Sequence, residues 1–155
     1  MRTPSLLAGL GLLAGVAVAE TRDEEFTVGD QLVRIEAGEG MEVMWVGPGA
    51  SEGTQVLSGP DIEIVAELTD DEALQMLGLR ALVAVVPGTH SCENLGDPRA
   101  YYVVTLGEAP AADGPLTTCV DLTVSTTPGQ IVLEEDPMGD GEYWTWSASG
   151  GFAGG

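Results

Sequence analysis

The segment Arg80-Ala81-Leu82-Val83-Ala84-Val85-Val86 is apolar at every position after the arginine. Because successive side chains of a β-strand point to opposite faces, a strand of this composition has both faces covered by protein. Pro87 and Gly88 end the segment, since proline lacks the backbone N–H that a central strand uses. The segment therefore predicts a central strand, with a helix on one face and the rest of the protein on the other.

The covering helix is predicted over residues 69–78. Thr69 can cap its first turn, and Glu72 three residues later completes a capping box. Apolar side chains at positions 73, 74, 76 and 77 recur at helical spacing, and Gly78 ends the pattern. A helix of only about two turns is stable only when it packs against a sheet.

Most of the remaining chain has the pattern of short strands separated by turns that contain Gly and Pro. The first such turn is predicted at Gly29 and Asp30, a pair of the kind that closes a two-residue hairpin. The clearest alternation spans 117–127, whereas 109–115 has the composition of a loop. We therefore predict an α+β fold, a mainly antiparallel β-sheet domain with one short helix packed on it. The other predicted strands are 26–28, 32–35, 41–46, 56–57, 62–65, 101–106, 131–134 and 143–147.

The N-terminus has the features of a secretory signal peptide. Arg2 gives a positive start, and residues 6–16 are a run of Leu, Ala, Gly and Val. Ala17-Val18-Ala19 forms a small-residue cleavage site before Glu20. The apolar run is shorter than the roughly 20 residues that a spanning helix needs, so no membrane insertion is expected after cleavage. The predicted location is periplasmic or secreted.

Three segments make up the predicted domain plan: a signal peptide at 1–19, a single β-rich domain at 20–148 and a flexible Gly-rich tail at 149–155. Export makes a disulfide possible, and the only two cysteines of the chain are Cys92 and Cys119. Closing the loop between them would stabilise the fold by roughly 3 to 4 kcal/mol on the chain-entropy model.

The charge balance excludes several partners. Asp and Glu total 25 against 5 Lys plus Arg, all five of them Arg, and the formal net charge is -20. A chain so acidic would be repelled by phosphate backbones, so nucleic acid is excluded as a partner. The acids are spread over most turns and edges, which favours a role in hydration and solubility in salty surroundings. The alternative is attraction of a basic peptide or an envelope protein.

Residues 82–122 resemble a group of small exported proteins of unknown function from Gram-negative bacteria. The likeness rests on the apolar strand, Cys92, the aromatic strand Tyr101-Tyr102-Val103-Val104 and the segment Thr117-Thr118-Cys119-Val120-Asp121-Leu122. The resemblance implies a disulfide-linked periplasmic β-rich domain and supplies no activity.

The segment Thr89-His90-Ser91-Cys92-Glu93-Asn94 resembles the Ser/Thr-His-Gly-Cys-x-Asn box of the L,D-transpeptidases, which crosslink peptidoglycan. The resemblance implies that Cys92 is a nucleophile. The additional upstream His of that family is absent, so His90, the only His of the chain, is the one remaining candidate for its base. Ser91 replaces the Gly of that box, and Glu93 places a negative charge beside the thiol, which makes it less reactive. We favour the disulfide and keep the Cys-dependent enzyme as an alternative.

Two groups of residues suggest metal binding. His90 and Cys92 with Met41 and Met44 could bind copper, although only one His is present and such sites need three or four ligands. The acidic turn after the predicted strand 131–134 could bind calcium through oxygen ligands. Its candidate ligands are Glu134, Asp136, Asp140 and Glu142.

The last predicted strand carries three aromatic residues, Tyr143, Trp144 and Trp146. Exposed rings could contact carbohydrate or a protein partner, whereas aromatic residues of small sheets usually lie in the core. Together these patterns predict a non-enzymatic exported protein without a cofactor, in an uncharacterised binding or envelope-associated role. The alternatives are the Cys-dependent peptidoglycan enzyme and a calcium- or carbohydrate-binding module.

Overall fold

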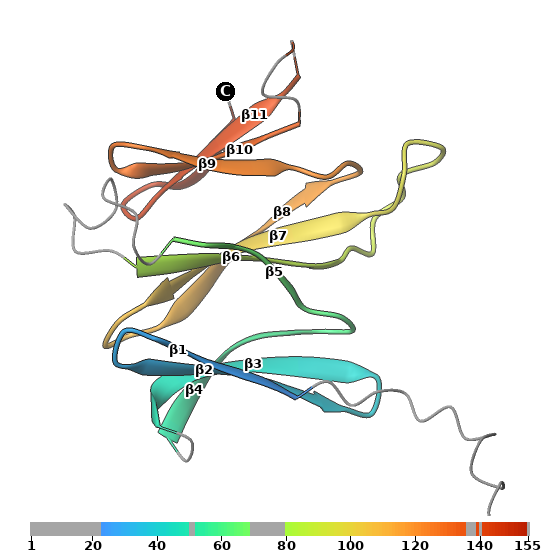
Figure 1. Cartoon of the computed structure of the whole chain (residues 1–155). Helices are drawn as coiled ribbons and strands as arrows, with labels where there is room; N and C mark the ends of the chain where they lie inside the picture. Colours follow the sequence, from blue (N-terminus) through green and yellow to red (C-terminus); the bar gives the residue numbers. More distant parts are fainter. Residues whose placement is uncertain (1–22, 50–51, 69–79, 136–138, 140, 155) are drawn as a thin grey trace, which may run out of the picture.

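The computed structural model describes residues 23–49, 52–68, 80–135, 139 and 141–154 (Figure 1). This part of the chain forms twelve β-strands in three four-stranded antiparallel sheets. Each sheet is a meander, because its strands pair with their neighbours in the sequence. Within the described ranges, no helix is long and apolar enough to cross a membrane.

Consecutive strands fill one sheet before the chain enters the next. Sheet A consists of β1 (Glu24–Val28), β2 (Gln31–Gly38), β3 (Met41–Gly49) and β4 (Glu52–Gly59). Sheet B consists of β5 (Glu63–Glu67), β6 (Arg80–Pro87), β7 (Arg99–Leu106) and β8 (Ala111–Thr118). Sheet C consists of β9 (Thr123–Thr127), β10 (Gln130–Glu134), β11 (Tyr143–Ser147) and β12 (Gly151–Gly154).

The sheets stack as three layers, with sheet B between sheets A and C (Figure 1). Apolar side chains of sheets A and B form the A–B core, and those of sheets B and C form the B–C core. In β6, Leu82 and Ala84 belong to the A–B core, whereas Val83 and Val85 belong to the B–C core. Sheet B therefore contributes to both cores through the ordinary alternation of a strand.

The predicted α+β class is wrong, because the described part of the chain is all β. β6 is covered on both faces as its sequence predicts, and residues 81–86 are all buried. Sheets cover both faces, where a helix was expected on one of them. An apolar strand requires two covered faces, but it does not specify whether a helix or a sheet covers them. The predicted helix, residues 69–78, lies outside the described residues.

The single strand predicted over 117–127 is in fact two strands in two sheets. β8 ends at Thr118 in sheet B and β9 begins at Thr123 in sheet C, so the chain crosses between layers at residues 119–122. The alternation of apolar and polar residues continues across the crossing and conceals it in the sequence. β8 itself begins at Ala111, within a segment that was predicted as a loop.

Tyr101 of β7 holds the crossing in place. Its phenol oxygen accepts a hydrogen bond of 2.9 Å from the backbone N–H of Leu122. The ring is 2 % exposed and belongs to the B–C core. Burial raises the pKa of this phenol above its ordinary value of 10.0, against the opposing effect of the Leu122 hydrogen bond.

The C-terminal segment differs from the flexible tail expected at 149–155. Gly151–Gly154 form β12, which pairs with β11 at the edge of sheet C. Phe152 lies opposite Trp146 in this pairing and packs against the B–C core. A cross-strand aromatic pair therefore gives this Gly-rich segment a packing partner that its composition does not reveal.

Candidate functional site

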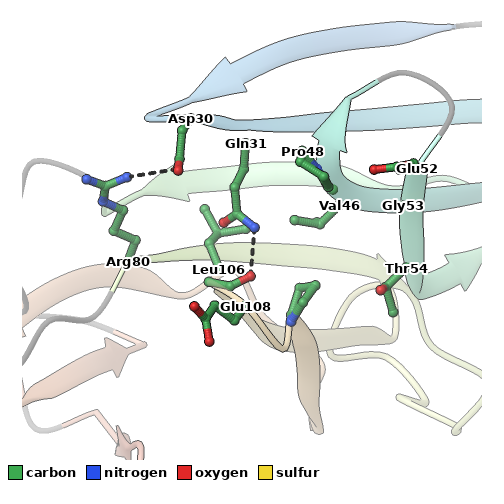
Figure 2. Close-up of a pocket in the computed structure, with 13 residues that line it drawn as sticks. Asp30, Gln31, Val46, Pro48, Glu52, Gly53, Thr54, Arg80, Leu106 and Glu108 are labelled. Atoms are coloured by element: carbon green, nitrogen blue, oxygen red, sulfur yellow. Dashed lines mark hydrogen bonds and ion pairs between the residues drawn. The ribbon is translucent and has the colours of Figure 1, made fainter.

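A cleft of about 960 Å³ lies between sheets A and B, beside Arg80 at the N-terminal end of β6 (Figure 2). Strand ends and turns of both sheets form its wall. We call it the A–B cleft. Its lining residues are Asp30, Gln31, Val46, Gly47, Pro48, Glu52, Gly53, Thr54, Arg80, Leu106, Gly107, Glu108 and Pro110.

Three carboxylates and one guanidinium line the A–B cleft. Asp30 lies in the β1–β2 turn and Glu52 is the first residue of β4, both in sheet A. Glu108 lies in the turn between β7 and β8 (Figure 2). Arg80 Nη1 lies 3.8 Å from Asp30 Oδ1. Within the described ranges, no ion pair is formed by Glu52 or Glu108. The cleft therefore has a formal excess of two negative charges.

Gly29 lets the Arg80 guanidinium lie directly against the turn that carries Asp30. Its φ of +62° lies in the left-handed region that favours glycine. A Cβ atom at this position would overlap Arg80 Nη1. The hairpin turn predicted at Gly29 and Asp30 therefore shapes one end of the cleft as well as reversing the chain.

Gln31 joins the two sheets across the cleft. Its side-chain Nε2 donates a hydrogen bond of 2.7 Å to the backbone oxygen of Gly107 (Figure 2). Val46 and Leu106 are buried beneath the cleft, and Pro48 and Pro110 supply its accessible apolar surface. The cleft thus combines apolar side chains with carboxylates, a combination that suits an organic cation with an alkyl stem.

Neither a protein-family model, nor a curated protein, nor a solved structure matches the chain. The function is therefore inferred from the residues and their geometry.

A smaller hollow of about 430 Å³ lies beside the other end of β6. Asp61, Glu63 and Asp97 line it together with Arg99. The Nε atom of Arg99 lies 2.7 Å from Asp121 Oδ1, so this guanidinium is paired outside the hollow. The hollow resembles the A–B cleft in charge and has less than half its volume, which makes it a useful control site.

Cys92 and Cys119 lie at a disulfide-bond distance, with their Sγ atoms 2.05 Å apart and their Cα atoms 5.5 Å apart. Cys92 lies in the loop between β6 and β7, and Cys119 lies where the chain crosses from sheet B to sheet C. Neither is a free thiol. The thiolate that a Cys-dependent peptidoglycan enzyme needs is therefore consumed by the bond in this form of the chain.

His90 lies beside this bond. A ring nitrogen of His90 and the Sγ atoms of Cys92 and Cys119 all lie within 4.8 Å of one another, and we call these three residues the His–Cys cluster. It is the one metal-compatible group of His, Cys, Asp and Glu side chains found among the described residues. Met44, suggested above as a copper ligand, is fully buried in the A–B core instead.

The aromatic residues of β11 divide between the two faces of sheet C. Trp146 is 3 % exposed, and its Nε1 donates a hydrogen bond of 2.8 Å to Asp113 Oδ2. Trp144 is partly buried and packs against the same B–C core. Tyr143, by contrast, is 44 % exposed. The two indoles thus contribute to packing, and no paired stacking surface is formed by the three rings.

The residues suggested for calcium are only partly described. Glu134 ends β10 and Glu142 precedes β11. The backbone N–H of Glu135 donates a hydrogen bond of 3.1 Å to the backbone oxygen of Glu142. Asp136 and Asp140 lie outside the described residues. Glu134 and Glu142 therefore lie at the two ends of one turn, and they are the two suggested ligands that fall within the described residues.

Sequence reasoning missed the A–B cleft, because its residues come from turns far apart in the chain. Asp30 was assigned only to a hairpin turn, and Arg80 only to the start of a strand. One signal was available: Arg80 is one of just five cationic side chains and stands directly before the apolar run. A cation at the end of a doubly buried strand marks the edge of a core, where a cleft can open.

Proposed function

We propose that the chain is an exported, non-enzymatic protein that binds a basic peptide segment in the A–B cleft. The observation that supports this proposal is the excess of two negative charges in a cleft with apolar walls between two sheets. The location in the periplasm or outside the cell rests on the N-terminal signal pattern. The partner would be a basic peptide or the basic segment of an envelope protein.

The charges of the cleft favour a cation over an anion. Arg80 is already beside Asp30, so an anion entering the cleft would meet the carboxylates of Glu52 and Glu108. An Arg or Lys side chain could instead lay its alkyl stem along Pro48 and Pro110, and place its charge near those carboxylates. The net charge of -20 would further attract a basic partner from a distance.

We expect the variant E52Q/E108Q to bind a fluorescent hexa-arginine peptide about 3- to 30-fold more weakly than the unchanged protein. The estimate assigns each exposed charge contact about 0.3 to 1 kcal/mol at low salt. Fluorescence anisotropy gives the dissociation constant, and binding should weaken as salt is raised. The matching peptide in which citrulline replaces arginine keeps the shape without the charge, and it should bind far more weakly.

The control variant E63Q/D97N makes the same change in net charge at the smaller hollow and should leave binding within about twofold. R80Q should change the dissociation constant in the opposite direction and tighten peptide binding, because it removes the cationic side chain that lines the cleft. If E63Q/D97N weakens binding as much as E52Q/E108Q does, the peptide is attracted only by net charge and the cleft is not its site.

Export is tested by the mass of the chain recovered outside the cytoplasm. Cleavage after Ala19 predicts a mature protein that begins at Glu20. Recovery of the uncleaved chain from the cytoplasm alone would contradict the location and leave the binding measurement to stand by itself.

A further inference from the structure

The His–Cys cluster is the second place where chemically reactive side chains converge, and it lies away from the A–B cleft. Cys92 is 6 % exposed, and His90 and Cys119 are partly buried. Their candidate ligand atoms lie within 4.8 Å of one another. Two thiolates bound to one tetrahedral Zn²⁺ lie about 3.7 Å apart, so the two Sγ atoms would have to move apart once the bond between them is reduced.

The backbone oxygen of Thr118 fixes the His90 ring. His90 Nε2 lies 2.8 Å from that oxygen, and because a carbonyl oxygen only accepts, Nε2 must carry the hydrogen. In the neutral ring the lone pair is therefore on Nδ1, which is buried and has no hydrogen-bond partner. Histidine ligands of protein metal sites usually have this division, with one nitrogen donating to a carbonyl and the other free to bind.

We propose that reduction of the Cys92–Cys119 disulfide converts the His–Cys cluster into a binding site for one Zn²⁺ ion. A dithiol reductant would supply two electrons and two protons, giving two thiols while the reductant becomes a disulfide. Zn²⁺ would then displace both thiol protons and bind the two thiolates and the imidazole. Two sulfur ligands and one nitrogen ligand form a known donor set for zinc, and water would complete the tetrahedron.

The surrounding structure can hold the cluster together without the disulfide. The loop between β6 and β7 is closed at its base by a hydrogen bond of 2.8 Å from Gly88 N–H to the Pro98 oxygen. The Arg99–Asp121 ion pair joins the end of this loop to the crossing that carries Cys119. Neither contact involves a sulfur atom, so we expect both to persist after reduction and to limit how far the two sulfurs can separate.

Glycine provides the space that this arrangement needs. A Cβ atom at Gly88 would lie 2.7 Å from His90 Nδ1. A Cβ at Gly96, whose φ is +120°, would lie 2.6 Å from the Cys119 oxygen. Both glycines therefore allow the loop to approach the His–Cys cluster closely.

Titration with Co²⁺ as a spectroscopic substitute for zinc tests the site. The chain is reduced with dithiothreitol, which is then removed under argon because it binds metals itself. We expect the reduced protein to bind one Co²⁺ with thiolate-to-cobalt charge-transfer absorption, and Zn²⁺ to displace it. The oxidised protein should show no such absorption. Near-ultraviolet circular dichroism of the reduced protein shows whether it keeps its packed structure.

Two variants separate this site from other metal binding. H90Q keeps a donor for the Thr118 oxygen but lacks the ring nitrogen, and it should lower the affinity of the reduced protein at least tenfold. C92S/C119S should lose the charge-transfer absorption entirely, and any cobalt it retains reports on surface carboxylates. The proposal is overturned if the reduced protein gives no charge-transfer absorption, or if H90Q binds with unchanged affinity, as thiols in an unfolded chain would. It does not depend on peptide binding in the A–B cleft.

Discussion

The variant C92A/C119A is expected to lose about 3 to 4 kcal/mol of unfolding free energy. The bond closes a loop with a sequence separation of 27 residues, and on the chain-entropy model this restriction of the unfolded chain accounts for the loss. It also fastens the loop between β6 and β7 to the crossing from sheet B to sheet C. Urea unfolding followed by tryptophan fluorescence measures the change, since the chain contains three Trp.

Reductant provides the matched control for this prediction. Dithiothreitol should destabilise the unchanged protein by a similar amount, in metal-free buffer, and should have no effect on C92A/C119A. H90Q, which keeps both sulfurs, should retain most of the stability. A loss below about 1 kcal/mol in C92A/C119A would mean that the disulfide constrains the unfolded chain far less than its loop length predicts.

Much of the strand pattern could be predicted from the sequence, because short strands with defined turns leave local signals. Gly29 and Asp30 separate β1 from β2 as predicted, and Gly129, with φ of +77°, lies in the turn before β10. The stacking of the sheets could not be predicted in the same way. The apolar residues 81–86 require cover on both faces, and a sheet satisfies that requirement as well as a helix does.

The two candidate sites differ in how far the sequence reveals them. His90 and Cys92 are two positions apart, so their proximity follows from the sequence, but the burial of His90 Nδ1 depends on how the loop packs against Thr118. The A–B cleft depends on the stacking of sheet A on sheet B, which brings Glu52 and Glu108 to one opening. Without the layer order, nothing local places these two carboxylates together.

Leu82→Ala and Leu133→Ala are each expected to lower the free energy of unfolding by about 2 to 5 kcal/mol. Both side chains have 0 % exposure, but Leu82 lies in the A–B core and Leu133 lies in the B–C core. Leu95→Ala makes the same chemical change at a residue that is 72 % exposed, and should stay within about 0.5 kcal/mol. Urea unfolding of the three variants gives the comparison.

These substitutions distinguish a three-layer stack from two layers with a loosely attached third. If sheet C packed only weakly on sheet B, Leu133→Ala would cost little, as Leu95→Ala does. Cooperativity is tested by placing Leu82→Ala in a chain that also carries Trp45→Phe, which leaves tryptophan only in sheet C. Sheet B contributes to both cores, so fluorescence from Trp144 and Trp146 should then show unfolding at a lower urea concentration. This is expected although Leu82 lies in the A–B core and the two indoles pack in the B–C core. An unchanged midpoint would mean that the B–C core unfolds as a unit separate from the A–B core.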